Sequence, residues 1–278
     1  MIMRNEEYEL VIKAGRSDFH YWRDLWRFRE LFLFLSWRDI LVRYKQTTIG
    51  IAWSVLRPLL TMIVFTVIFG RLAKLPSDGV PYPIMVFAAM LPWQFFANSL
   101  FECSNSLIAN ASVLTKVYFP RLIVPASAII VSLVDFFISS ALLAILMVWY
   151  RFIPDWRIIM LPLFLGLAFL ASFGFGLLFA ALNVKYRDFR YVVPFIVQFG
   201  LYVSPVGFSS SVVPEKWRLL YALNPMVGVI DGFRWAILGG NAQLYWPGFW
   251  LSAGLTLFVF LIALRYFRST ERAFADII

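Results

Sequence analysis

Six long apolar runs, joined by short polar segments, make up most of this chain after its first 48 residues. A helix needs about 20 apolar residues to cross roughly 30 Å of hydrocarbon, and all the runs but the short fifth are near or above that length. The pattern predicts an all-α integral membrane protein with six transmembrane helices. The predicted spans are Ile49–Phe69, Pro83–Ile108, Leu122–Trp149, Ile158–Leu182, Tyr191–Val206 and Pro247–Leu264.

The chain before the first run has a different pattern. From Tyr21 to Lys45, aromatic residues such as Trp22 and Trp26 alternate with charged ones such as Arg23 at helical spacing. Tryptophan favours the headgroup layer of a membrane, and arginine stems reach from it to the charged surface. We expect an N-terminal amphipathic interface helix lying in the headgroup plane. Two parts result: a cytoplasmic N-terminal segment (1–48) and a transmembrane domain (49–278).

The stretch between the fifth and sixth runs is apolar but interrupted. Asn224 is a good helix cap and Pro225 suits the first helical position; Pro214 begins an earlier helix, and Gly239 ends the later one. Both helices are too short to cross a membrane, so they predict a re-entrant helical hairpin between spans five and six. They are expected near Glu215–Ala222 and Met226–Leu238.

Composition agrees with a membrane protein. The chain is 61% hydrophobic and only 15% charged, whereas soluble domains are about 45–50% apolar and about 25% charged. The net charge is +9, and segment 1–48 alone contains nine Lys and Arg. The positive-inside rule then makes both termini cytoplasmic. The charge is explained by anionic lipid, so no nucleic-acid partner is expected.

Several chemistries have no motif here. A single cysteine, Cys103, and a single histidine, His20, exclude a disulfide framework and the common metal clusters. The dipeptide Gly-Lys never occurs, so a phosphate-binding loop for ATP is absent. Carboxylates form no close pair within a span, which argues against an enzyme. We expect no cofactor or metal in this chain.

Two charged residues lie inside apolar runs. Asp135 is either a functional site or a carboxyl group hydrogen-bonded to Ser, Asn or Tyr of a neighbouring helix. Arg57 precedes Pro58, which predicts a kinked span. Its guanidinium either anchors the helix to lipid or binds a phosphate, whose oxygens it contacts bidentately.

Two short loops on the predicted cytoplasmic side mix cations with aromatic residues. They serve either as lipid anchors or as docking surfaces for a cytoplasmic motor protein. The loop candidates for such coupling are Lys116, Tyr118, Phe119, Pro120, Arg121, Tyr186, Arg187 and Asp188.

A group of aromatic residues near the predicted outer face is either core packing or the lining of a channel. Sugar rings have apolar faces that stack on aromatic rings, so such a lining would let a glycan slide. The candidates are Trp93, Phe96, Tyr202, Phe208, Trp217, Tyr221, Phe233 and Trp235.

Four stretches resemble the membrane subunit of polysaccharide-exporting ABC transporters, the type-2 permeases that export O-antigen, capsule or teichoic acid chains. The last stretch, with its Ala-Leu-Asn-Pro and Asp-Gly-Phe-Arg-Trp elements, is the most specific. The stretches are Trp37–Pro58, Tyr118–Asp135, Leu182–Pro205 and Val213–Gly239.

The resemblance implies a homodimer working with two copies of a separate ATP-binding subunit, which would carry ATP and Mg. It implies export of an O-antigen-like glycan on polyprenyl diphosphate across the bacterial inner membrane, as in lipopolysaccharide biosynthesis. Alternatives are a type-2 exporter of a small molecule or lipid, a membrane enzyme acting on lipid-linked glycans, and a passive channel. If the chain exports such a glycan, the candidate residues for binding its diphosphate are Arg38, Arg43, Lys45 and Arg57.

Overall fold

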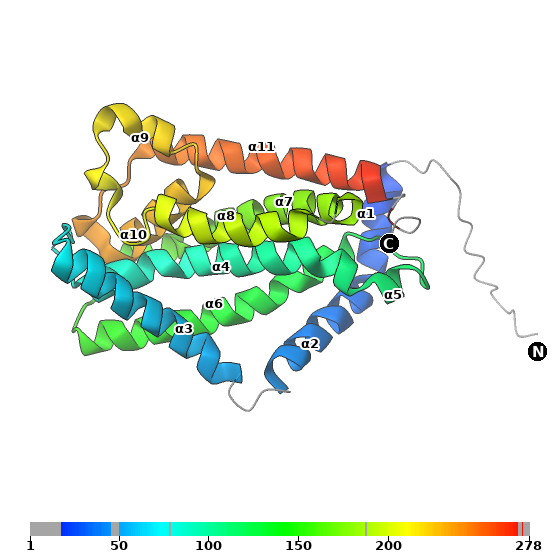
Figure 1. Cartoon of the computed structure of the whole chain (residues 1–278), viewed down its shortest axis with the longest axis horizontal. Coiled ribbons are helices and arrows are strands. Elements are labelled where there is room, and N and C mark those ends of the chain that lie inside the picture. Colours follow the sequence, from blue (N-terminus) through cyan, green and yellow to red (C-terminus); the bar gives the residue numbers. More distant parts are fainter. Residues whose placement is uncertain (1–17, 46–49, 78, 187, 272–273, 275–278) are drawn as a thin grey trace, which may run out of the picture.

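The computed structural model describes residues 18–45, 50–77, 79–186, 188–271 and 274, and within these ranges the chain is helical without strands (Figure 1). A π-helical segment, Thr66–Leu72, continues α3, and short 3-10 helices occur at Trp156–Met160, Ser210–Val212 and Gly239–Asn241. The α-helices are α1 (Asp18–Arg27), α2 (Arg29–Lys45), α3 (Gly50–Phe65), α4 (Tyr82–Ala109), α5 (Ala111–Leu114), α6 (Ile123–Trp149), α7 (Leu161–Lys185), α8 (Phe189–Val203), α9 (Glu215–Tyr221), α10 (Pro225–Leu238) and α11 (Trp246–Thr270).

Five helices in the described part of the chain are long and apolar enough to cross a membrane. This finding confirms the expected multi-pass membrane protein and five of its predicted spans. Pro58 lies inside the first of these helices, as the sequence predicts. The spans are Ala52–Leu72, Tyr82–Ala109, Ile123–Trp149, Trp156–Lys185 and Trp246–Thr270.

The fifth expected span is helix α8, which has only 15 residues. At 1.5 Å per residue it extends about 22 Å, less than the roughly 30 Å of hydrocarbon. The six-span count therefore stays a prediction. Nevertheless α7 ends at the end of the bundle that α1 crosses, whereas α11 begins at the opposite end (Figure 1). The segment α8–α10 thus leads the chain back along the bundle between two spans.

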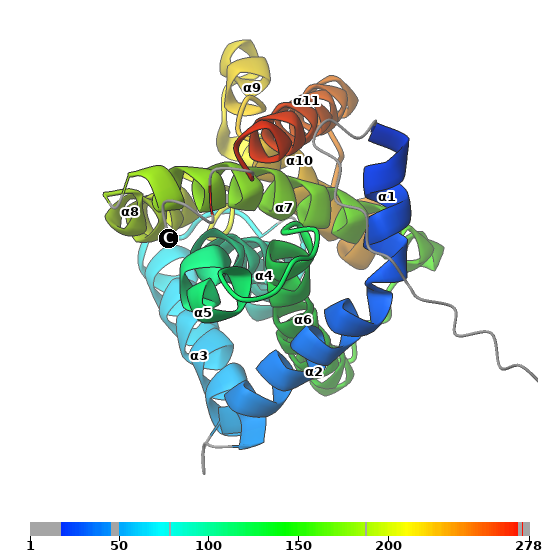
Figure 2. The same ribbon diagram turned by 90° about the vertical axis from the view of Figure 1, so that its right-hand side faces the viewer.

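Helix α4 occupies the centre of the bundle and is packed by α3, α6, α7, α8 and α10 (Figure 2). Near its N-terminal end, residues 84–93 are a continuous block of buried residues. The helix α7 approaches α4 at Gly176, where a Cβ atom would lie 2.5 Å from Cys103 Sγ. Only glycine permits this contact without displacing α4, because larger side chains overlap the buried thiol.

The N-terminal region forms two helices instead of the single one expected over Tyr21–Lys45, and they meet at Phe28. Helix α1 crosses the end of the bundle, and α2 passes obliquely over α6 (Figure 2). Tyr21 Oη donates to Glu271 Oε2 at 3.0 Å, and Arg268 lies over the Tyr21 ring at 4.6 Å. The two described ends of the chain are thus joined on one side of the molecule.

The interrupted segment forms α9 and α10 within one residue of their expected starts. Asn224 caps α10 because its side-chain oxygen accepts from Met226 N at 3.1 Å, and Pro225 takes the first helical position. Gly239 ends α10 with φ of 66°, a left-handed conformation that favours glycine. The helices are confirmed, whereas their re-entrant position in a membrane stays a prediction.

Candidate functional site

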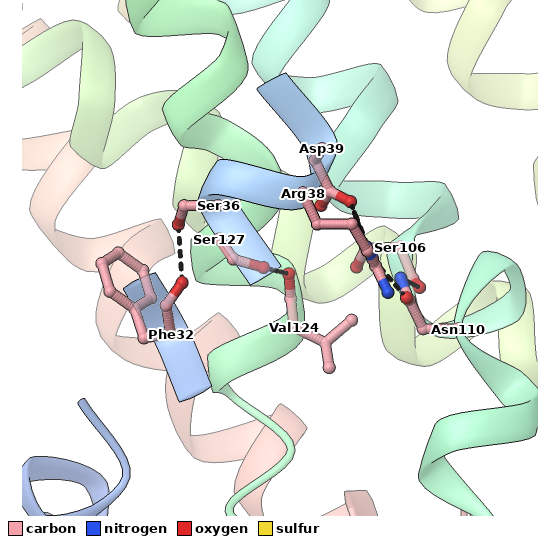
Figure 3. A network of polar contacts seen from close by, with 8 residues as sticks. All are labelled: Phe32, Ser36, Arg38, Asp39, Ser106, Asn110, Val124 and Ser127. Carbon is pink, nitrogen blue, oxygen red and sulfur yellow. Dashed lines mark hydrogen bonds and ion pairs between the residues drawn. The ribbon is translucent and has the colours of Figure 1, made fainter. Parts of the chain in front are cut away.

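The first candidate cation, Arg38, is part of the contact between α2 and the neighbouring helices (Figure 3). Its Nη2 atom lies 2.7 Å from Asp39 Oδ1 and donates to Asn110 Oδ1 at 2.7 Å. The buried serines Ser36 of α2 and Ser127 of α6 lie nearby, where these two helices cross. The Arg38 guanidinium therefore already joins α2 to the end of α4.

A second ionic cluster lies deeper in the bundle, around Asp135 at the thirteenth position of the 27-residue helix α6. Arg43 Nη2 is 2.7 Å from Asp135 Oδ2, and Arg43 Nη1 is 3.1 Å from Glu102 Oε1. Tyr44 and Ser54 donate to Asp135 Oδ1 at 2.5 Å and 3.0 Å. Hydrogen bonding of Asp135 to Ser and Tyr, one of the two alternatives for this residue, is observed, and Arg43, a partner that we did not expect, neutralises its charge.

This environment also changes Tyr44. Burial first, and then the hydrogen bond and negative charge of Asp135, raise the pKa of Tyr44 to about 12. The phenol is therefore protonated at neutral pH and remains a donor to the carboxylate.

Two cavities meet at Arg43. One, of about 570 Å³, is bounded by α3, α4 and α6 and includes Arg57, Asp135 and Arg43 in its wall. The other, of about 550 Å³, lies toward α1 and includes Arg38 as well as Arg43. Three of the four cations predicted for a diphosphate thus line neighbouring cavities, whereas Lys45 is exposed at the end of α2 and lines neither.

The two predicted coupling loops lie at the end of the bundle where α1 crosses (Figure 1). In the first loop Lys116 and Tyr118 are exposed, whereas Phe119 and Pro120 are buried. Arg121 Nη1 donates to the backbone carbonyl of Glu271. The buried side chains of Phe119 and Pro120 anchor the loop and leave its outer surface to the exposed neighbours, and coupling through this loop stays a prediction.

The second loop offers Tyr186, which is 49% exposed, and Asp188, which is also exposed. Lys185 Nζ lies 5.1 Å from the centre of the Tyr186 ring. Arg187 lies outside the described residues.

The eight predicted lining aromatics do not form one surface. Trp93 and Phe96 are nearly buried and face an apolar cavity of about 390 Å³ between α4, α7 and α8. Tyr202 and Trp217 are 61% and 52% exposed. Phe208 is half-buried.

Three members of the set are engaged in packing. Phe233 is fully buried and has ring contacts with Phe136 and Phe164, which places it in core packing, one of the two alternatives for these aromatic residues. Trp235 is half-buried and Arg157 lies 5.0 Å from its ring. Tyr221 Oη donates to Val203 O at 2.9 Å, and burial, followed by Asp231, raises the Tyr221 pKa.

Sequence reasoning missed an exposed aromatic stripe on α8. Four residues spaced by four, four and three positions are all more than half exposed, and such spacing places them on one helix face. The rings of Phe195 and Phe199 are stacked with an interplanar angle of 12°. The spacing was a usable signal. The stripe consists of Tyr191, Phe195, Phe199 and Tyr202.

Arg234, on α10, was also missed. It is 3% exposed, and it donates to the backbone carbonyls of Val206 and Phe208 at 3.0 Å and 2.6 Å. A weaker contact of 3.4 Å reaches Met85 O at the start of α4. Arg234 thereby joins the segment after α8 to the central helix. No motif signalled this role, because main-chain carbonyls belong to every residue.

The five long apolar helices define a multi-pass helical membrane protein. The described residues contain no group of metal-ligating side chains. The family described as "ABC-2 type transporter" matches residues 30–238, so this chain belongs to that family. The resemblance found in the four sequence stretches is thereby confirmed, and the family consists of transport subunits instead of catalytic enzymes.

Named relatives cover most of this chain. It is 26% identical to the O-antigen export system permease protein RfbA of Klebsiella pneumoniae, over 90% of this chain and 95% of that protein. It is 27% identical to RfbA of Myxococcus xanthus, over 76% of this chain and 82% of that protein. It is 23% identical to the polysialic acid transport protein KpsM of Escherichia coli, over 85% and 92%.

Proposed function

We propose that this chain is the membrane subunit of an ATP-driven exporter that moves a polysaccharide linked to polyprenyl diphosphate across the bacterial inner membrane. The observation that carries the proposal is the end-to-end similarity to an O-antigen export permease, over 90% of this chain and 95% of the relative. Similarity to the polysialic acid transport protein supports a glycan cargo instead of a small molecule.

In this proposal two copies of the chain form the path and two copies of a separate subunit bind ATP and Mg. Both termini are cytoplasmic, α1 lies in the headgroup plane and α9 with α10 form the re-entrant hairpin. The exposed side chains of Lys116, Tyr118, Tyr186 and Asp188 dock on the ATP-binding subunits, because aromatic side chains are costly to leave in water. The aromatic stripe of α8 supplies rings on which sugars stack.

Affinity purification of this chain from native membranes in mild detergent tests whether it associates with a separate ATP-binding subunit. Recovery of a stoichiometric ATP-binding subunit is the expected result, and the double variant Tyr118→Ala/Tyr186→Ala should lose most of it. Trp149→Ala is the matched control, because Trp149 is an aromatic residue, 81% exposed, at the other end of α6. This control should recover the subunit as the unmodified chain does.

Recovery of no ATP-binding subunit with the unmodified chain would contradict the motor-driven mechanism. Equal recovery by the double variant and the control would contradict the assignment of the two loops as docking surfaces.

A further inference from the structure

The wall of the cavity between α3, α4 and α6 is largely apolar but contains several polar side chains, at a depth where side chains of membrane proteins are mostly apolar. Hydrogen-bonding groups face it from all three helices. Asp135, at the middle of α6, is among them, and charged groups inside a span are costly and are functional candidates by default. The other polar groups in the wall are Arg43, Ser54, Arg57, Thr61, Gln94, Asn98, Ser132 and Ser139.

Two of these groups are available to a ligand. No described residue forms an ion pair or hydrogen bond with the Arg57 guanidinium, and the Ser132 hydroxyl is fully buried without a partner among described residues. An unsatisfied buried hydroxyl indicates water or a bound polar group. Phosphate oxygens accept hydrogen bonds from a guanidinium and from a hydroxyl, so a phosphate suits both.

The rim of the cavity reaches the protein surface on α3. Trp53 and Leu60 both line the cavity and are 60% and 54% exposed. Their side chains are amphipathic or apolar, which matches lipid at this depth. A ligand with a charged head and apolar chains could therefore place its head at Arg57 and keep its chains outside.

A second guanidinium faces the same cavity but is already engaged. Arg43 is held by Asp135 at 2.7 Å and by Glu102 at 3.1 Å. It also lines the neighbouring cavity toward α1, so it stands between the two. Carboxylates and phosphates compete for the same guanidinium geometry.

If Arg43 turned to another anion, both carboxylates would lose their counter-charge but each would keep other stabilising contacts. Asp135 Oδ1 keeps two donors, Tyr44 Oη at 2.5 Å and Ser54 Oγ at 3.0 Å. The Glu102 side chain is 42% exposed and is open to solvation. Arg43 can therefore exchange its carboxylate partners for another anion at a limited cost.

We propose that this cavity binds the phosphate group of a lipid at Arg57, and that Asp135 restrains this binding by holding Arg43. The proposal rests on the lipid-linked cargo proposed above and adds the location of its charged head and a competing carboxylate. The chemistry required is a phosphate ester attached to apolar chains. Its two sources are a polyprenyl diphosphate and an anionic phospholipid.

Equilibrium binding to the purified complex tests this site. The probes are a polyprenyl diphosphate and phosphatidylglycerol, measured separately by native mass spectrometry. Arg57→Gln should weaken binding about tenfold, because it removes a charge-assisted bidentate contact. Asp135→Asn should strengthen binding about threefold, since it frees Arg43 for the ligand. A structural role alone would not produce opposite signs.

Arg71→Gln is the matched control, because Arg71 is an exposed arginine in the π-helical continuation of the same span and should leave both affinities unchanged. The probe that binds with the higher affinity identifies which lipid supplies the phosphate group. Equal affinity of Arg57→Gln and the unmodified chain would overturn the site. Weaker or unchanged binding by Asp135→Asn would overturn the restraint. Each variant must recover the ATP-binding subunit normally, so failure of the motor is detected separately.

Discussion

Arg43 of α2 and Arg234 of α10 both contact the central helix α4, at two different positions along it. The chemical groups that they contact differ in kind. Arg234 contacts the carbonyl of Met85 near the start of α4 and two carbonyls after α8. Arg43 contacts the carboxylate of Glu102, which lies 17 residues further along α4, about 25 Å away. Arg234 is 3% exposed, whereas the Arg43 side chain is 33% exposed.

This difference separates a structural arginine from an exchangeable one. Main-chain carbonyls are fixed by the helix and loop that contain them, and they do not titrate. Carboxylate side chains rotate, become protonated and accept other donors. We therefore interpret Arg234 as a fixed connection at the end where α10 packs, and Arg43 as a group whose partners can change.

The largest expected effect is at Arg234. Arg234→Gln should lower the free energy of unfolding by about 3 kcal/mol or more, because several buried carbonyls lose a charged donor. Cys103 is the only cysteine and is fully buried, so its labelling by a thiol-reactive dye on heating reports unfolding. Retention of the unmodified melting temperature would contradict the structural role.

A double-mutant cycle should measure the coupling energy between Arg43 and Asp135, a side-chain pair of a kind that Arg234 lacks with its carbonyl partners. Arg43→Gln should destabilise the protein, because Asp135 loses its counter-charge, and adding Asp135→Asn should restore about 1–3 kcal/mol. The same dye measurement applies to all four proteins of the cycle. Strictly additive effects would show that the 2.7 Å pair contributes no coupling.

The stability of the region around α10 should also depend on the Asn224 side chain that caps this helix. Asn224→Ala should cost about 1 kcal/mol, because Met226 N loses its acceptor. Asn224→Asp is the control, since it keeps that acceptor and removes only the donation to Ser204 Oγ at 2.9 Å. Thermal unfolding should rank the alanine variant below the aspartate variant, and the reverse order would refute the capping role.

The smallest effect concerns Tyr44 and pH. Its raised pKa means that the folded protein binds the phenol proton more tightly than the unfolded chain. The stability that Tyr44 adds relative to Tyr44→Phe should be complete below about pH 10 and lost as pH rises through about 12. Circular-dichroism melts of both proteins across that interval measure it; a pH-independent difference would contradict the prediction.

Local features were predictable from the sequence. The cap at Asn224 and the end at Gly239 depend on neighbouring residues, so both helix boundaries of α10 were anticipated. The long apolar runs gave the spans for the same reason. For the site, only the kinds of partner could be predicted from the sequence, since hydroxyl partners were one alternative for Asp135. The ion pair with Arg43 could not be predicted, because Arg43 is 92 positions away and the sequence does not indicate that α2 crosses α6.

Hydrophobic length and charge distribution by themselves determined that the chain spans a membrane several times, because the solvation of apolar and charged groups is a property of each residue. Tertiary packing alone decided which way the side chains face. It buried Phe233 and Phe119, left Tyr118 exposed and brought Arg43 to Asp135. Those outcomes depend on which helices touch, and contacts between helices distant in sequence leave no local pattern in the chain.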